Sequence, residues 1–377
     1  MRPASEVELR RLNDTFAELC AIASPSGRER AVADRVAQEL RALGLDVEED
    51  DAAAATGGDC GNLLARLRGR SERSVLLCAH LDTVPHDGPI EPVLVDGAWE
   101  SAGETILGAD NKVAVAVLLG LAHRAAVEGT PVSVELLFTV GEENALGGAK
   151  AFDVSRLRSE LGYVFDHASP IGEVVVASPT YYRVTAEFRG RAAHAGIRPE
   201  AGRSAIVAAA RAIAAMPHGR IDDETTANVG SIHGGGGSTN VVPERCRVMA
   251  EARSLDTDRV EQVIAEMIDA VHDAAADAEC DVDVVSEKLM DGYRRKGSAP
   301  AIAAAEAALR SCGYEPSRIP TGGGSDANAL AAQGFECINL ANGTEHNHEP
   351  TERVSVAALE GMFDVCLTLL DEVAALS

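Results

Sequence analysis

The sequence predicts an α/β fold in which one domain is interrupted by a second, smaller one. Over residues 1–178, short apolar runs rich in valine and leucine alternate with amphipathic helical patterns. This alternation is typical of a largely parallel sheet that is covered by helices on both faces. Residues 179–295 instead follow a βαββαβ order, and over residues 296–377 the first rhythm returns. We therefore expect a discontinuous α/β domain that carries an inserted domain.

The elements of the first domain follow from the spacing of its apolar residues. Helical spacing over Glu6–Ile22 and Glu29–Leu43 ends in each case at a glycine- or proline-containing turn. The longer apolar stretch Ala109–Val127 predicts a buried helix. Continuous apolar runs predict strands at residues 62–67, 74–79, 132–140, 161–165 and 173–177. After the inserted domain, the pattern predicts a helix at 299–311, a strand at 335–340 and a helix at 354–374.

The inserted domain has the order of a ferredoxin-like fold. Its strands are expected at 181–189, 226–233, 240–253 and 280–288, and its helices at 202–216 and 256–276. A split βαβ unit of this order folds as one four-stranded sheet with both helices on one face. Such a sheet has exposed edges, which two copies can cover by pairing edge to edge. We therefore expect a homodimer that forms through this domain.

Composition and charge exclude several classes of protein. With 46% hydrophobic and 25% charged residues, the chain of 377 residues is typical of a globular protein. The 34 basic and 59 acidic residues give a net charge of −25, which repels phosphate backbones, so nucleic acid is not an expected partner. No long uncharged apolar stretch and no apolar leader are present, which argues against a membrane span or a secretory signal. Eight cysteines without a Cys-x-x-Cys pair indicate buried thiols in a reducing, cytosolic compartment.

Polar side chains follow three of the predicted strands directly. These residues are His80 and Asp82, the pair Glu142 and Glu143, and Asp166. Because the carboxyl ends of strands form the binding crevice of an open α/β sheet, we expect these groups to converge. Asp110 opens the buried helix, and His346 and His348 lie in the loop before the last helix.

Together these side chains suit a pair of zinc-like cations. The candidate ligands are His80, Asp110, Glu143, Asp166 and His348. Metals of this kind take nitrogen and oxygen ligands, and one carboxylate can bridge two of them at about 3.5–4 Å. Asp82 shares a face with His80 at the strand end and can orient its ring. Each group alone also has an ordinary explanation: a hydrogen-bonded histidine, a solvated glutamate pair, or a helix N-cap at Asp110.

The sequence around these residues resembles a known superfamily, the dinuclear zinc aminopeptidases, carboxypeptidases and aminoacylases. The resemblance lies in His80-Leu81-Asp82-Thr83-Val84-Pro85, Gly108-Ala109-Asp110-Asn111-Lys112 and Thr139-Val140-Gly141-Glu142-Glu143. In the inserted domain, Ala193-His194-Ala195-Gly196, Thr239-Asn240-Val241-Val242-Pro243 and Glu251-Ala252-Arg253-Ser254 are similar to the peptidase T-like, or tripeptidase-like, branch. The resemblance covers nearly the whole chain. It implies a zinc-exopeptidase-like catalytic domain with an inserted lid and dimerisation domain.

The resemblance also implies a role for each residue at the strand ends. Asp110 would bridge two metals, with His80 and Asp166 on one metal and Glu143 and His348 on the other. Asp82 would orient His80, and Glu142 would be general base and then general acid. A cis peptide bond after Asp110 is also implied. His348 is preferred to His346, because the terminal ligand of the family lies four residues before a glutamate, which is Glu352 here.

The inserted domain would supply groups that hold the substrate. His194 resembles the lid histidine that polarises the scissile carbonyl, and in dimeric relatives this histidine reaches the partner's metal site. Asn240 and Arg253 would hold the backbone and the carboxylate of the substrate, a task that suits a guanidinium group. A plain surface histidine and an exposed strand arginine are the competing explanations. Gly324-Ser325-Asp326-Ala327-Asn328 is a variant of a substrate-loop motif, which leaves the substrate preference open.

The resemblance and the residues together predict a cytosolic metal-dependent exopeptidase. It would hydrolyse short peptides, as an aminotripeptidase does, with water activated by two divalent ions, zinc first and cobalt or manganese as alternatives. A deacylase of N-acyl amino acids or a carboxypeptidase-type amidohydrolase would use the same site. An inactive binding homologue would have lost a ligand or the base, and none is lost here. A two-metal phosphoesterase would need cationic groups to hold phosphate, and these motifs contain few.

Overall fold

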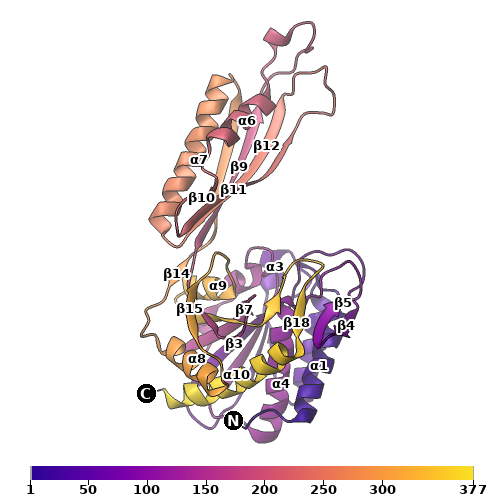
Figure 1. The fold of residues 1–377 in the computed structure, drawn as a ribbon, viewed down its shortest axis with the longest axis vertical. Helices are drawn as coiled ribbons and strands as arrows, with labels where there is room; N and C mark the ends of the chain where they lie inside the picture. The colour runs from indigo at the N-terminus through magenta and orange to yellow at the C-terminus, as the bar shows by residue number, and fades with distance from the viewer. Residues whose placement is uncertain (1, 377) are drawn as a thin grey trace. The chain divides into compact units, whose positions relative to one another are not determined.

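The computed structural model describes residues 2–376, which form two compact units (Figure 1). One unit runs from the start of the described chain to Ala177 and resumes at Arg295, and the other comprises Ser178–Arg294. Each unit has a hydrophobic core of its own. Within the described residues, no helix combines the length and the apolarity that a membrane span requires.

The first unit is built around a mixed sheet in the order β1-β2-β6-β3-β7-β16-β8, and β15 also pairs with β8. Its strands are β1 (Val47–Glu49), β2 (Leu63–Leu67), β3 (Ser74–His80), β6 (Ser133–Thr139), β7 (Leu161–His167), β8 (Glu173–Ser178), β15 (Ser317–Pro320) and β16 (Glu336–Ala341). The four central strands β6, β3, β7 and β16 run parallel. Antiparallel pairing joins β2 to β6 on one side and β8 to β16 on the other. The carboxyl ends of the central strands therefore lie at one edge of the sheet.

Helices cover both faces of this sheet. The longer helices are α1 (Glu6–Cys20), α2 (Arg30–Ala42), α4 (Ala109–Glu128), α8 (Pro300–Ser311) and α10 (Val356–Ala375). They share one core with Val75, Leu77 and Ala79, which are alternate residues of β3. On the opposite face of β3, the thiol of Cys78 lies 3.8 Å from a carboxylate oxygen of Asp326, which begins α9 (Asp326–Ala332). Short helices also form at α3 (Ala52–Thr56), α5 (Gly147–Ala151) and the 3₁₀ turn Val154–Arg156.

A small second sheet in the first unit was not predicted. It has the order β17-β18-β5-β4, with β4 (Pro92–Val95), β5 (Ala98–Ser101), β17 (Thr344–Glu345) and β18 (Arg353–Ser355). Its strands have only two to four residues, too few to show an alternating pattern. The pairing of β17 with β18 closes the loop that carries His346 and His348.

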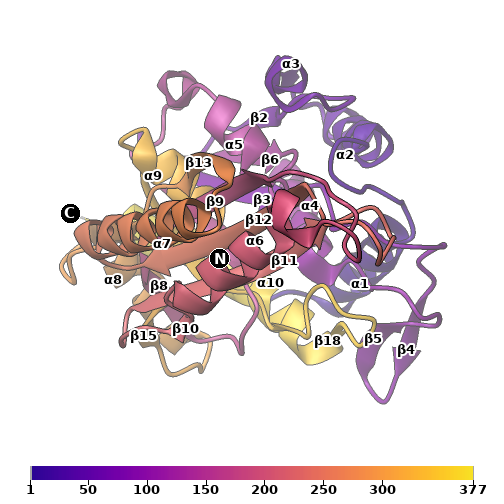
Figure 2. The same cartoon turned by 90° about the horizontal axis from the view of Figure 1, so that it is seen from above.

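The second unit is a ferredoxin-like domain, as predicted. Its sheet has the order β10-β11-β12-β9-β13. The elements are β9 (Thr180–Arg189), α6 (Ala205–Ala215), β10 (Gly219–Arg220), β11 (Thr225–Gly234), β12 (Arg245–Ser254), α7 (Thr257–Asp277), β13 (Asp281–Met290) and β14 (Tyr293–Arg294), with a 3₁₀ turn at Pro199–Ala201. Figure 2 shows α6 and α7 side by side over the strands, and both contribute to one core with Val184, Ala186 and Phe188 of β9.

Two details of the second unit differ from the sequence prediction. The two-residue strand β10 was not predicted, and it pairs with only Thr226 and Ala227 of β11. β12 begins at Arg245 and not at residue 240. The residues before β12 pair instead with the loop around His194, because the N–H of Val242 donates to Ala193 O and the N–H of Ala195 donates to Asn240 O, both at 2.9 Å. The predicted long strand is therefore divided into a strand and a separate paired loop.

Candidate metal centre

The predicted metal ligands come from five places in the first unit that the fold brings together. His80 is the last residue of β3, Asp166 lies near the end of β7, and Asp110 is the second residue of α4. Glu143 follows the end of β6, and His348 lies in the loop between β17 and β18. Parallel pairing of β6, β3 and β7 accounts for the convergence, because it places the ends of these strands side by side.

Asp110 lies between two imidazole rings and presents one oxygen to each. Its Oδ1 is 3.3 Å from Nε2 of His80, and its Oδ2 is 3.3 Å from Nε2 of His348. Asp166 Oδ1 lies 3.4 Å from the same nitrogen of His80, and Glu143 Oε1 lies 2.8 Å from that of His348. Two groups of one histidine and one carboxylate therefore meet at a shared carboxylate.

The loop before the last helix brings His348 to the cluster, and His346 points elsewhere. The side chain of His346 is 56% exposed, and its nearest carboxylate is Glu349, at 3.9 Å. Asn347, between the two histidines, donates a hydrogen bond of 2.8 Å from Nδ2 to Asp110 Oδ2. This contact was not predicted, since an asparagine in a loop carries no sequence signal of its own.

The backbone around Asp110 is held by a second buried carboxylate. The Asp110–Asn111 peptide bond is cis, which confirms the prediction. Glu352 accepts hydrogen bonds from the N–H groups of Gly108, at 2.7 Å, and of Asp110, at 2.9 Å. Burial, opposed by these hydrogen bonds, raises the pKa of Glu352 to about 7. The glutamate four residues after His348 therefore fastens the start of α4.

Asp82 is fully buried behind His80 and accepts several hydrogen bonds. Its Oδ1 lies 3.3 Å from Nδ1 of His80 and accepts the N–H of Glu142 at 3.0 Å. Its Oδ2 accepts the hydroxyl of Ser26 at 2.6 Å and the N–H of Glu143 at 3.1 Å. Burial alone would raise the pKa of Asp82, but the hydrogen bonds from His80 and Ser26 outweigh it and lower the pKa. Asp82 is therefore held as an anion beside the ring of His80, whose Nδ1 also lies 3.0 Å from the backbone oxygen of Asp82.

The charges of the cluster fit a site for cations. Burial and the charge of Asp166 raise the pKa of Glu142 well above its ordinary value, and burial and the charge of Asp110 do the same for Asp166. Hydrogen bonds to Asp110 and Glu143 raise the pKa of His348 to about 10. Burial together with neighbouring negative charge therefore disfavours the ionised forms of Glu142 and Asp166, and divalent cations would relieve this repulsion. The donor atoms of His80, Asp110 and Glu143, and those of His80, Glu142 and Asp166, lie within 4.8 Å of one another, close enough to share an ion.

The three residues predicted to bind substrate all lie in the second unit. His194 is exposed and forms an isolated β-bridge with Val241, next to Asn240. Arg253 lies near the end of β12, where its guanidinium stacks 4.2 Å above the ring of Tyr181 and pairs with Glu251 at 3.1 Å. The structure thus joins the loops of His194 and Asn240, whereas Arg253 is held by its own neighbours in the sheet.

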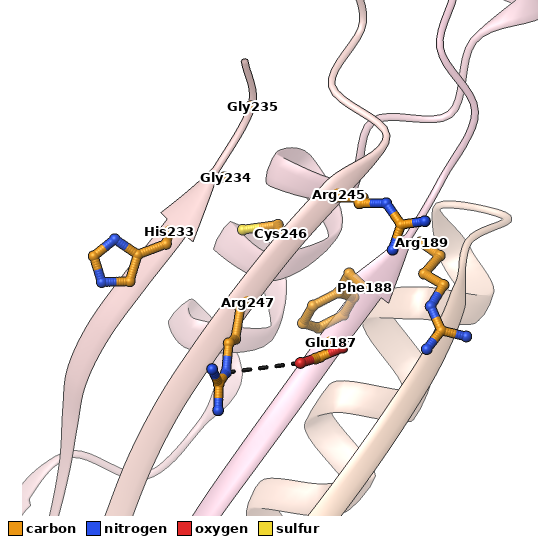
Figure 3. Close-up of a pocket in the computed structure, with 9 residues that line it drawn as sticks. All are labelled: Glu187, Phe188, Arg189, His233, Gly234, Gly235, Arg245, Cys246 and Arg247. Carbon is orange, nitrogen blue, oxygen red and sulfur yellow. Dashed lines mark ion pairs between the residues drawn. The ribbon is translucent and has the colours of Figure 1, made fainter. Parts of the chain in front are cut away.

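A cavity of about 320 Å³ lies where β9 ends and β12 begins, and it was not predicted (Figure 3). Arginine side chains of β9 and β12 and the ring of His233 surround it, and Arg247 pairs with Glu187 at 3.8 Å. It lacks the cluster of imidazoles and carboxylates that the first unit contains. The groups suited to hydrolysis therefore lie in the first unit.

The fold and the cluster together define a metal-dependent hydrolase with an α/β catalytic domain and an inserted domain. Family models match both parts of the chain. Residues 179–279 match the peptidase dimerisation domain, and residues 62–169 match peptidase family M28.

Relatives of the whole chain give the same result. The uncharacterized protein YqjE of Bacillus subtilis is 37% identical over 374 residues, which are 98% of this chain and 100% of that protein. The crystal structure of aminopeptidase PepT from Bacillus cereus is 37% identical, with a TM-score of 0.87 over 97% of this chain and 99% of that one. A tripeptidase structure from Staphylococcus aureus is 33% identical, with a TM-score of 0.92 over the same shares. The chain belongs to the peptidase T-like branch of the dinuclear metallopeptidase superfamily and is a metal-dependent peptidase.

Proposed function

We propose that the protein is a cytosolic aminopeptidase that hydrolyses short peptides, tripeptides first, at a site with two divalent cations. The observation that carries this proposal is the position of Asp110, which presents one oxygen to the His80 group and the other to the His348 group. A carboxylate shared in this way is the ligand that a two-metal site needs at its centre. The B. cereus relative is named an aminopeptidase and the S. aureus relative a tripeptidase, which supports a short peptide as the substrate.

The donor set supports a specific division of the ligands. His80 and Asp166 would hold one cation, Glu143 and His348 the other, and Asp110 both. Nitrogen and oxygen ligands in this ratio suit zinc, and cobalt or manganese would also be accepted. Asp82 would fix the tautomer of His80 from behind, since its Oδ1 lies 3.3 Å from Nδ1 of that ring.

Glu142 is the proposed general base. Bound divalent cations would supply Lewis acidity that polarises the scissile carbonyl and lowers the pKa of water. A carboxylate oxygen of Glu142 takes the proton of the attacking water and later gives it to the leaving amine. Burial and the charge of Asp166 raise the pKa of this carboxyl well above its ordinary value, which increases its affinity for a proton. A positioned base of this kind contributes about 10²–10⁴-fold to the rate.

The second unit would serve as lid and as dimer interface. β10 covers only Thr226 and Ala227 of β11, so in the described structure the rest of that edge lacks a strand partner. Apolar side chains are exposed beside this edge: Ile232 at 45%, and Ile206 and Val207 of α6 at 36% and 45%. A second copy that paired along this edge would cover both the backbone and the apolar groups. His194 of one chain would then donate a hydrogen bond to the substrate carbonyl in the other, and Asn240 and Arg253 would hold the substrate.

Three measurements test the dimer and the role of His194. Ile232→Asp should yield monomers in analytical ultracentrifugation, whereas Val285→Asp, which changes a 62% exposed side chain of β13, should leave the dimer intact. His194→Ala should lower kcat by about 10²–10³-fold, the usual cost of one lost oxyanion donor. Mixing inactive His194→Ala and Glu142→Gln chains should restore activity, because a mixed dimer holds one site with both groups. Verified subunit exchange without recovery would exclude action across the interface.

A peptide panel tests the proposed reaction. The metal-loaded protein is incubated with a dipeptide, a tripeptide and the N-acetylated tripeptide, and the products are identified by mass. Release of the first residue from the free tripeptide, with no cleavage of the acetylated one, is the expected result. Cleavage of N-acetyl substrates alone would contradict the proposal and indicate a deacylase.

A further inference from the structure

Glu29 is a buried carboxylate outside the proposed ligand set. It stands immediately before α2 and is 1% exposed. Its Oε1 accepts two backbone hydrogen bonds of 3.0 Å, one from the N–H of Gly27 and one from the N–H of Gly141. Gly141 directly precedes Glu142. One carboxylate oxygen therefore ties the N-terminal loop to the segment that carries the base.

Three successive N–H groups of that segment donate to buried carboxylates, while its carbonyl oxygens accept backbone N–H groups of residues 146–148. Gly141 donates to Glu29, and the next two N–H groups, of Glu142 and Glu143, donate to Asp82 at 3.0 and 3.1 Å. Gly141 has a φ of +61°, a left-handed conformation that favours glycine. This backbone conformation sets the direction in which the N–H of Gly141 points. Each of three successive N–H groups thus has a buried acceptor, and these bonds restrain the backbone from which the Glu142 side chain extends.

The same two carboxylates are joined through the N-terminal loop. Ser26 donates its hydroxyl to Asp82 at 2.6 Å, and the next residue, Gly27, donates its N–H to Glu29. The N–H of Ser26 donates to Thr83 O at 3.1 Å, which fastens the loop beside Asp82. Glu29 and Asp82 therefore each accept hydrogen bonds both from the N-terminal loop and from the segment that carries Glu142.

We propose that Glu29 is a positioning residue that sets the place of the general base Glu142 through the N–H of Gly141. This inference rests on the proposed role of Glu142. A general base must lie within hydrogen-bond reach of the water proton, and a displacement of about 1 Å at a catalytic group can cost about 10²-fold in rate. Glu29 Oε1 accepts hydrogen bonds from the N–H groups of Gly27 and Gly141 and from none of the proposed ligands, so its loss should affect turnover and spare metal binding.

A different role for Glu29 is open to the same test. Donor atoms of Glu29, Asp59 and Cys60 lie within 4.8 Å of one another, and Oε2 of Glu29 is buried without a hydrogen-bond partner. A cation there would compete with Arg30, whose N–H donates to Asp59 Oδ1 at 2.9 Å and whose guanidinium donates to Asp59 O. This positive side chain favours the positioning role. A third ion per chain in the wild type that disappears in Glu29→Ala would overturn the proposal.

The experiment compares Glu29→Ala with Glu29→Gln in the metal-loaded full-length protein. Alanine removes the acceptor, whereas glutamine keeps a carbonyl oxygen that can accept both N–H groups. Glu29→Ala should lower kcat by about 10- to 100-fold with KM and metal content unchanged, and Glu29→Gln should restore most of the wild-type kcat. Glu29→Asp, which withdraws the oxygen by one methylene, replaces the alanine variant if that one fails to fold.

Glu135→Ala is the matched control. Glu135 is also 1% exposed and accepts two backbone N–H groups, of Arg158 and Ser159, each at 2.8 Å, in the first half of β6. Both alanine variants should lower the Tm, but only Glu29→Ala should lower kcat. An equal kcat in the two variants, or loss of metal from Glu29→Ala, would overturn the positioning role.

A double variant separates this inference from the proposed function. If Glu29 acts through Glu142, Glu29→Ala combined with Glu142→Gln should be no slower than Glu142→Gln alone, because the base that Glu29 positions is already lost. A further 10-fold loss in the double variant would overturn the inference and leave the role of Glu142 intact. Wild-type activity in Glu142→Gln alone would instead overturn the base assignment.

Discussion

Replacement of Asp82 by asparagine is a sensitive probe of the centre. Asparagine keeps one oxygen and replaces the other with an NH₂ group, which cannot accept a hydrogen bond. The hydroxyl of Ser26 and the N–H of Glu143 both donate to Oδ2, so at least one of these donors, or the N–H of Glu142, would lose its acceptor in a fully buried place. An unsatisfied buried group of this kind costs about 1–3 kcal/mol. We therefore expect the free energy of unfolding of Asp82→Asn to fall by at least that amount.

The same change should also weaken metal binding. Asp82 Oδ1 faces the ring nitrogen of His80 at 3.3 Å, and removing a partner of this kind usually lowers metal affinity by about 10–100-fold. Urea denaturation of the metal-free protein measures the first effect, and titration against a chelator of known affinity measures the second. Glu135→Gln is the control, since it alters a buried carboxylate elsewhere in the first unit and should lower stability alone. Wild-type metal affinity in Asp82→Asn would refute the reasoning.

Three further results are expected. Glu143→Gln should lose stoichiometric binding of the second ion, and two tightly held ions by elemental analysis would contradict its place among the ligands. Exhaustive chelation should abolish peptidase activity and lower the Tm, because the buried carboxylates then repel one another. Added zinc, cobalt or manganese should restore the activity and the Tm. Peptidase activity in protein shown to be metal-free would contradict this expectation. Burial alone would raise the pKa of Glu8, but hydrogen bonds from Arg124 and Ser5 lower this pKa from 4.5 to about 2. Ionised Glu8 therefore stabilises the fold above pH 4.5, and this stabilisation is lost as the pH falls towards 2. Calorimetry should show that the Tm deficit of Glu8→Gln shrinks over that interval, and a constant deficit would contradict the role of Glu8.

Long periodic segments were predicted well, because the pattern of apolar residues within each segment indicates which of its faces are buried. The pattern at Ala109–Val127 is apolar on all sides, and α4 extends over Ala109–Glu128 in the core. The strand of residues 240–253 was placed too early, because the pairing of residues 240–242 with the loop of His194 is a long-range contact. The strands β17 and β18 were missed for the same reason, since two or three residues become a strand only through their partner.

The residues of the candidate centre that lie at strand ends or within motifs could be predicted from the sequence. His80 and Asp166 directly extend apolar strands, so their convergence follows from parallel pairing. The roles of Ser26, Glu29 and Asn347 could not be predicted in this way. Their partners lie between 56 and 237 positions away along the chain, and single polar residues in loops have no periodicity. Such contacts are set by the fold and become visible only in three dimensions.

The central claim is that Glu142 is the base of a metal-dependent peptidase whose ligands lie around Asp110. Glu142→Gln tests it most directly, because the change removes the basic oxygen and none of the proposed ligands. Elemental analysis and tripeptide turnover are measured on the same preparation. Two ions per chain, with kcat lowered by about 10²–10⁴-fold, is the expected result. Turnover above about a tenth of the wild-type value in fully loaded Glu142→Gln would contradict the claim, since the lost base should cost far more.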